Sequence, residues 1–183
     1  MTSVAPLPIP TPRLRLLPLR VADATEMAGV LGDQALHAYT GGAPEDPAVL
    51  RARYERWVAG SPDPAVTWCN WVVHLRSERC LVGTVQATVE EVAGHRRAEV
   101  AWVVGSRWQR RGIATEAAGH LVHWLVERSV HEVVAHIHPD HRASAAVAAA
   151  AGLVPTDHRQ DGEVRWALPT PRRSSGPAPT TDC

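Results

Sequence analysis

The hydrophobic pattern changes its period once near the middle of the chain. Residues 99–104 form a short run of mostly β-branched and aromatic side chains that ends at Gly105, which is typical of a β-strand. From Ile113 to about Glu127, apolar residues recur every four positions, which predicts an amphipathic helix. The loop Gln109-Arg110-Arg111-Gly112-Ile113-Ala114 joins this strand to this helix.

That loop has the composition of an anion-binding site. Glycine beside small or branched residues lets backbone N–H groups point outward at a helix start, where the helix dipole and two arginines add positive charge. The spacing is not that of a P-loop, which ends in Gly-Lys-Ser/Thr, nor that of a dinucleotide fingerprint with its three glycines. The loop by itself is compatible with a phosphate or pyrophosphate site and with an ordinary strand-to-helix turn.

The first third of the chain alternates short elements with turns. Residues 1–12 contain four prolines and predict a flexible lead-in, and residues 13–19 predict a first strand, whose proline favours a sheet edge. Asp23 and Glu26 predict a capping box for a helix that ends near Gly32. A turn-rich loop at 39–44 precedes a second helix over 47–58. The two helices and their loop could form the wall of a pocket, or the loop could be a plain connection.

The remaining elements predict a mixed sheet. Strand-like runs at 68–75, 80–89 and 99–104, joined by tight turns, predict an antiparallel meander. Residues 131–138 predict a strand parallel to 99–104, because a helix separates the two. A helix over 140–151, closed by Gly152, precedes two short strands at 153–159 and 163–168. From Pro169 the Pro, Ser, Thr and Arg content predicts a disordered tail.

Composition narrows the class of protein. A chain of 183 residues with 45% hydrophobic content corresponds to one domain with a sizeable core. Lys plus Arg and Asp plus Glu balance at 19 each, which argues against a nucleic-acid or anionic-membrane binder. Three cysteines without metal-ligand spacing favour a reducing, cytoplasmic compartment. No run approaches the ~18 apolar residues of a membrane span, and the start has no signal-peptide apolar region.

Taken together, the strand, the loop and a downstream helix resemble the GNAT family of N-acetyltransferases over about residues 11–168. Within that family they are most similar to the branch of ribosomal-protein and other N-terminal amine acetyltransferases. The loop Gln109-x-x-Gly112-x-Ala114 is similar to the Arg/Gln-x-x-Gly-x-Gly/Ala acetyl-CoA loop. The helix motif His141-x-x-Ser144, closed by Gly152, is similar to the family's Asn-x-x-Ser helix.

The resemblance implies an α/β GNAT fold for residues 13–168. Its mixed, mostly antiparallel sheet would have six or seven strands, splayed at the centre, with helices on both faces. Acetyl-CoA would be the co-substrate, with its pyrophosphate on the loop and its pantetheine between the strand ending at Val104 and the strand ending at His138. The residues implied in coenzyme binding are Trp102, Val103, Val104, Gln109, Arg110, Arg111, Gly112, Ile113, Ala114, Thr115, His141 and Ser144.

The implied reaction is direct attack of a neutral amine on the thioester carbonyl in a ternary complex. Glu99 stands where the branch often places its general base, although a strand-end charge facing solvent is the alternative. A main-chain N–H of Val103 or Val104 would serve the oxyanion. This chain departs from the family at His141, where Asn is common, and at Ala148, where some members have a proton-donating Tyr. The acid for the thiolate is therefore Ser144, His141, a water or no dedicated group.

The acceptor is the least determined part of the prediction. Tyr39, Trp68 and Asn70 are expected to face the acceptor cleft, and the acceptor is either a protein N-terminus or a small-molecule amine. The alternative function is a coenzyme A-binding module with little or no turnover. The resemblance implies no metal, although His136 and His138 lie near His141. The balanced charge disfavours a nucleic-acid partner, and no membrane partner is expected. Homodimers are frequent among relatives, so a homodimer is expected as one possible assembly.

Overall fold

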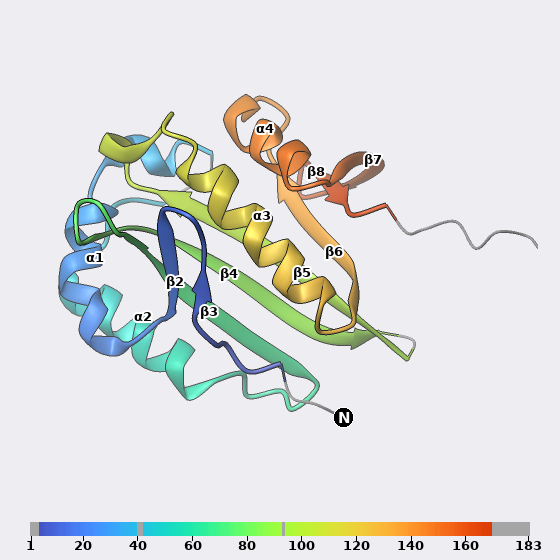
Figure 1. Ribbon diagram of the computed structural model, residues 1–183, viewed down its shortest axis with the longest axis horizontal. Helices are drawn as coiled ribbons and strands as arrows, with labels where there is room; N and C mark the ends of the chain where they lie inside the picture. The colour runs from blue at the N-terminus through green and yellow to red at the C-terminus, as the bar shows by residue number, and fades with distance from the viewer. Residues whose placement is uncertain (1–3, 40–41, 93, 170–183) are drawn as a thin grey trace, which may run out of the picture.

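Eight strands pair in one open sheet in the order β1-β2-β3-β4-β5-β6-β8-β7 (Figure 1). The computed structural model describes residues 4–39, 42–92 and 94–169. The strands are β1 (Ile9–Pro10), β2 (Leu14–Pro18), β3 (Val66–Leu75), β4 (Cys80–Val92), β5 (His95–Val104), β6 (Val130–Ile137), β7 (Val154–Gln160) and β8 (Glu163–Ala167). The β5–β6 pair is parallel and the other pairs are antiparallel. The predicted meander and the predicted parallel pair are confirmed.

Helices cover both faces of the sheet, as predicted. They are α1 (Ala24–Val30), α2 (Pro47–Ala59), α3 (Ile113–Val126) and α4 (Arg142–Ala150), with short 3-10 turns η1 (Val21–Asp23), η2 (Gln34–His37) and η3 (Ser106–Trp108). The α3 helix crosses the face turned to the viewer in Figure 1, and its Trp124 packs edge-on against Trp71 of β3. Side chains alternate between the two faces along a strand. Thr84 of β4 and Val103 of β5 lie opposite each other on the face away from α3, which is the face that α1 and α2 cover.

The α3 helix shows why its sequence pattern was informative. The four residues of its predicted apolar stripe are all at most 2% exposed: Ile113, Ala117, Leu121 and Leu125. A stripe repeated every three to four residues lies on one side of a helix, so it is buried as a unit against the sheet. Burial of this stripe fixes where the first turn of α3 lies relative to the end of β5.

The N-terminal residues differ from the predicted flexible lead-in. Val4 and Ile9 are buried, and Ile9 begins β1, which pairs with β2 at Leu16. The Trp71 Nε1–H donates to the Leu7 carbonyl at 2.8 Å, and the Cys69 thiol donates to the Val4 carbonyl. Prolines lose their N–H groups but keep their carbonyls, so the segment can dock by accepting hydrogen bonds. The extra strand makes eight strands rather than six or seven, and it takes the edge predicted for residues 13–19.

The first helix is confirmed, but its predicted capping box is wrong. The Asp23 carboxylate accepts from the backbone N–H and the guanidinium of Arg20, so it closes η1 instead of capping α1. The Glu26 carboxylate accepts from the Leu81 N–H at 2.7 Å, which ties α1 to the start of β4. Sequence spacing could not reveal that a distant strand would compete for Glu26. The predicted disordered tail, residues 169–183, lies outside the described residues except for Pro169.

Candidate acetyl-transfer site

The centre of the site is the point where β5 and β6 separate. Their parallel pairing runs from Arg96 opposite Val130 to Glu99 opposite Val134 and stops there. Beyond it, β5 stays paired with β4 up to Val104, while β6 stays paired with β8 up to Ile137. Figure 1 shows the two strands diverging towards the end where α4 lies. The predicted central splay is thus confirmed, and it leaves strand edges that can bond to an extended ligand.

A cavity of about 640 Å³ follows this opening from the end of β5 to the first turns of α3 and α4. Most of the residues predicted to bind coenzyme line it: Trp102, Val103, Val104, Gln109, Arg110, Gly112, Ile113, Ala114, Thr115, His141 and Ser144. Arg111 lies elsewhere, because its guanidinium donates to the Glu78 carboxylate at 2.8 Å. Of the two loop arginines, only Arg110 therefore adds its charge to the cavity.

Two residues of the loop before α3 have a left-handed backbone conformation. Gly112 has a φ of 74°, which a glycine adopts without steric cost, and Arg110 has a φ of 59°. Among the described residues no side chain caps α3 at Gly112. The first N–H groups of a helix have no intrahelical acceptor, so these groups remain available at the cavity wall. The Gln109 side-chain amide donates to the Val104 carbonyl at 3.0 Å and joins the loop to β5.

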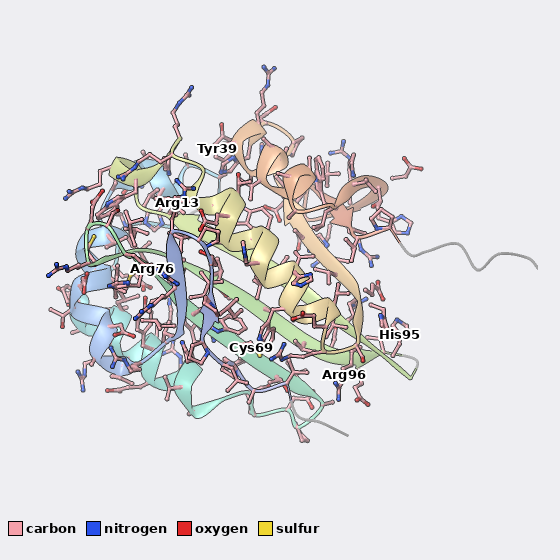
Figure 2. The ribbon with its side chains drawn as sticks, in the orientation of Figure 1. Arg13, Tyr39, Cys69, Arg76, His95 and Arg96 are labelled. Atoms are coloured by element: carbon pink, nitrogen blue, oxygen red, sulfur yellow. The ribbon has the colours of Figure 1, made fainter. Side chains whose placement is uncertain are left out.

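The N-terminal segment supports this loop from behind. The Glu116 carboxylate, in the first turn of α3, accepts from the Thr11 hydroxyl at 2.5 Å, the Arg13 N–H at 2.8 Å and the Arg13 Nε at 2.6 Å. The Arg13 guanidinium also donates to the Arg111 carbonyl at 2.9 Å. Figure 2 shows Arg13 at the loop end of α3. Burial alone would raise the pKa of Glu116, but these hydrogen bonds outweigh it and lower the pKa.

His141, which stands where the family commonly has Asn, is the N-cap residue of α4. Its Nδ1 accepts from the Ser144 N–H at 3.2 Å and so caps α4, while its Nε2 lies 3.3 Å from the Ser144 hydroxyl. The Tyr39 and His141 rings lie with their centroids 4.3 Å apart and their planes tilted by 34°. Burial, with a smaller contribution from His138, lowers the pKa of His141. The ring is therefore held in the neutral form that an accepting Nδ1 requires.

The inner end of the opening is a small cavity of about 120 Å³ beside Trp102, Tyr39 and Ser144. Ala148 is the fully buried residue of α4, so the position of the missing Tyr faces the core. Glu163, at the start of β8, also lines this cavity. Sequence reasoning missed Glu163, because nothing in the pattern of residues 163–168 shows that β8 lies next to β6.

Glu99, in β5, lies outside the small cavity that Ser144 of α4 lines. Its carboxylate bonds to the His136 Nδ1 at 2.8 Å, and its side chain is 54% exposed while that of His136 is 12% exposed. His136 lines the small cavity as well as a neighbouring hollow of about 270 Å³ that contains Glu99. The structure therefore brings Ser144 and His141 together and connects Glu99 to them through His136.

The three predicted acceptor residues are separated. Tyr39 lines the coenzyme cavity and the small inner cavity. Trp68 and Asn70 lie on the face of β3 turned towards α2, because Trp71 points to α3. Within the described part of the chain, neither lines any of the cavities discussed in this section. Residues 40–41 of the predicted loop at 39–44 lie outside the described residues.

The part of the chain that the structure describes, residues 4–39, 42–92 and 94–169, contains no cluster of three or more His, Cys, Asp or Glu side chains arranged to hold a metal ion. None of its helices combines the length and the apolar character needed to cross a membrane.

The comparisons with known proteins agree with the fold. A family model described as the acetyltransferase (GNAT) domain matches residues 13–154. The chain belongs to the GNAT family of acetyltransferases, as the sequence motifs predicted. A comparison with curated protein sequences finds no match.

Solved structures of acetyltransferases share the fold. A GNAT-family acetyltransferase from Bacillus anthracis is 19% identical, with a TM-score of 0.70, over 88% of this chain and 98% of that one. The ribosomal L7/L12 α-N-protein acetyltransferase RimL in complex with coenzyme A is 15% identical, with a TM-score of 0.72, over 88% and 97%. Spermidine N-acetyltransferase from Vibrio cholerae, in complex with coenzyme A and spermine, is 18% identical, with a TM-score of 0.66, over 85% and 93%.

Proposed function

We propose that the protein transfers an acetyl group from acetyl-CoA to a primary amine, which is a protein N-terminus or a small molecule. The observation that carries the proposal is the continuity of one cavity from the end of β5, beyond its pairing with β6, to the uncapped start of α3. Open strand edges suit the amide groups of pantetheine, and a helix start suits a pyrophosphate. Structural neighbours have coenzyme A bound, and the acceptors named for them are a ribosomal protein and spermidine.

In this proposal the chain holds the coenzyme mainly with its backbone. The N–H groups of residues 110–114 and the charge of Arg110 bind the pyrophosphate, with Thr115 in the first turn of α3. Residues 102–104 bond to the pantetheine, and the N–H of Val103 or Val104 donates to the oxygen of the thioester carbonyl. Arg111, which pairs with Glu78, contributes its backbone rather than its side chain.

The proton transfers use side chains around the small inner cavity. Glu99 takes the proton of the attacking amine. His136 lies between Glu99 and the amine, because it bonds to Glu99 and lines the cavity. Ser144 gives a proton to the departing thiolate, and the neutral His141 fixes the Ser144 backbone and lies within reach of its hydroxyl. No separate Tyr is required at position 148.

A binding module without turnover is the second candidate. It is favoured by the buried Ala148 and by the position of Glu99 one side chain away from the inner cavity. The two candidates differ in a single measurable step, the release of free thiol from acetyl-CoA when an amine is present.

Three experiments test the proposal. Acetyl-CoA at a hundredfold excess over its Kd should stabilise the protein by about 2.7 kcal/mol and raise its Tm by roughly 5–10 °C. Thiol release should then depend on an amine from a panel of peptides and small amines. The Glu99→Gln variant should lose roughly 10²- to 10⁴-fold in kcat while keeping coenzyme binding. Glu55→Gln, on the exposed face of α2, is the matched control.

The outcomes separate the candidates. A flat thermal titration contradicts the coenzyme site. Binding without thiol release for any amine supports the module instead. If Glu99→Gln keeps the wild-type rate while coenzyme binds, the assignment of the base is wrong and Glu163 becomes the carboxylate to replace. The cytoplasmic compartment and the homodimer stay predictions, to be checked by fractionation and by light scattering.

A further inference from the structure

A second cavity, of about 410 Å³, lies between α1, α2 and the sheet. Its wall is largely apolar, from Leu31, Leu36, Leu50, Trp57 and Val103. Leu36 and Val103 also line the small inner cavity where the acetyl group is proposed to lie. The second cavity therefore adjoins the reacting centre on the side of the sheet opposite α3.

The wall of this cavity contains an unusual group of polar atoms. In the described residues, four buried side-chain nitrogen or oxygen atoms have no hydrogen-bond partner. Three of the four belong to residues that line this cavity: His37 Nε2, Glu45 Oε2 and the Tyr54 hydroxyl. Tyr54 is fully buried. Each unpartnered buried polar group costs about 1–3 kcal/mol, so these three atoms favour a ligand or water in the cavity that pairs with them.

The charges around these atoms nearly cancel. The other oxygen of Glu45 binds the Arg53 guanidinium, which also lies over the Trp57 ring. Burial, with a smaller contribution from the charge of Asp23, raises the pKa of Tyr54, so its phenol stays protonated and able to donate. Among the described residues that line the cavity, Glu45 and Arg53 are the only acidic and basic side chains apart from His37. The cavity thus offers hydrogen-bonding atoms without a net charge.

We propose that this cavity binds the side chain next to the reacting amine, and that it selects an uncharged side chain with a hydroxyl or an amide on a short hydrocarbon. This inference rests on the proposed acetyl transfer. The acceptor it describes is a peptide whose first residue has such a side chain. A hydroxyl or amide N–H can donate to Glu45 Oε2, its oxygen can accept from the Tyr54 hydroxyl, and its methylene or methyl groups meet the leucines.

The same chemistry disfavours a polyamine. A polyamine carries a second ammonium a few methylenes from the reacting nitrogen, which places a cation in this cavity. The carboxylate of Glu45 is already neutralised by Arg53, so that cation would be buried without a counter-charge. An acceptor with a negatively charged side chain would likewise be buried without a counter-charge, because Arg53 is already paired with Glu45.

The test compares peptides that differ only at the first residue. A threonyl peptide should have a kcat/KM roughly 10- to 100-fold above its valyl isostere, because a site built for a hydroxyl rejects an analogue without it. Spermidine should be slower than either peptide. Tyr54→Phe and Glu45→Gln should each lower kcat/KM for the threonyl peptide by roughly tenfold and leave the valyl peptide within about twofold. Glu55→Gln, at an exposed position of the same helix, should change neither.

Thermal stability gives a second readout with a diagnostic sign. Tyr54→Phe removes an unpartnered buried hydroxyl, so the Tm of the unliganded protein should stay the same or rise. A structural hydroxyl would instead lower the Tm when it is removed. Selectivity lost together with stability kept or gained is the pattern expected of a ligand-binding group.

Direct binding keeps this inference separate from the proposed activity. Calorimetry of the protein saturated with coenzyme A should show tighter binding of the threonyl than of the valyl peptide, whether or not turnover occurs. Peptides that bind in this order without thiol release contradict the proposed function and leave the inference standing. Equal binding of the two peptides, a preference for spermidine, or a Tyr54→Phe effect that is the same for both peptides overturns the inference.

Discussion

His141 illustrates how one residue can change while its structural part is preserved. The family motif commonly has Asn at this position, and Asn is among the strongest helix N-cap residues. In this chain the imidazole Nδ1 accepts the hydrogen bond from the Ser144 N–H, and the ring lies against that of Tyr39. An imidazole caps a helix only while this nitrogen is unprotonated, so the substitution adds a dependence on pH that Asn lacks.

This pH dependence can be measured. Burial lowers the pKa of His141 below its ordinary value of 6.5. Because the folded pKa is depressed, the contribution to stability is complete above pH 6.5 and is lost as the pH falls through the folded pKa. His141→Asn should keep the Tm at pH 7.5 and flatten its fall below pH 6.5. His141→Ala should lower the Tm at pH 7.5 by roughly 2–4 °C, for the loss of a cap that contributes about 1 kcal/mol. Identical melting curves for all three proteins would contradict the capping assignment.

At the scale of elements, the start of α3 depends on a segment more than 100 residues away in the chain. Glu116 gathers hydrogen bonds from Thr11 and Arg13, and Arg13 in turn holds the backbone of Arg111 in the coenzyme loop. The prolines of residues 1–12 indicated only a flexible lead-in. The position of Glu116 in the sequence, in the first turn of the helix, did not indicate which distant donors its carboxylate would accept hydrogen bonds from.

Glu116→Gln should therefore affect both stability and coenzyme binding. Loss of charge-assisted hydrogen bonds should cost roughly 1–3 kcal/mol in the free energy of unfolding at pH 7. The pKa of Glu116 is lowered from 4.5, so its contribution is present above pH 4.5 and is lost as the pH falls through the folded value. The variant should accordingly lose less stability than the wild type on going from pH 7 to pH 3, as followed by urea unfolding.

Coenzyme binding gives the second readout for this support. Acetyl-CoA should bind Glu116→Gln more weakly, because the loop backbone loses the position that Arg13 gives it. Glu127→Gln is the control, since Glu127 lies on the exposed end of α3 and pairs only with His123 among the described residues. Wild-type affinity in Glu116→Gln would show that the loop keeps its shape without this support.

At the scale of the whole molecule, the strand pairing at the centre of the sheet, between β5 and β6, is much shorter than that between β3 and β4. β3 and β4 pair over ten residue positions, whereas β5 and β6 pair over four. Strand edges without partners open easily, so the unliganded protein should be least stable where the coenzyme is proposed to bind.

Hydrogen exchange should locate this weakness. Amides of residues 100–104 that face β6 should exchange faster than those of β3 in the unliganded protein. Acetyl-CoA should slow them selectively, because the ligand supplies the missing partners. Uniform slowing over the sheet would indicate global stabilisation only, and unchanged exchange at residues 100–104 would place the ligand elsewhere.

The sequence by itself determined the elements that have a strong period and the loop between them. The stripe of α3, the meander of β3 to β5 and the parallel β6 follow from local side-chain patterns, and Gly112 with its neighbours was enough to indicate the family. These features could be predicted because helix and strand geometry act over a few residues.

Only the tertiary structure decided which distant side chains meet. The docking of residues 4–12 under β3, the separation of Glu99 from Ser144 by His136, and the place of Glu163 depend on how the strands are ordered in the sheet. The same holds for the cavity of His37, Glu45 and Tyr54, which forms only when α1 and α2 pack on the sheet. The coenzyme end of the site was encoded locally, whereas the acceptor end is built from contacts between elements far apart in the chain.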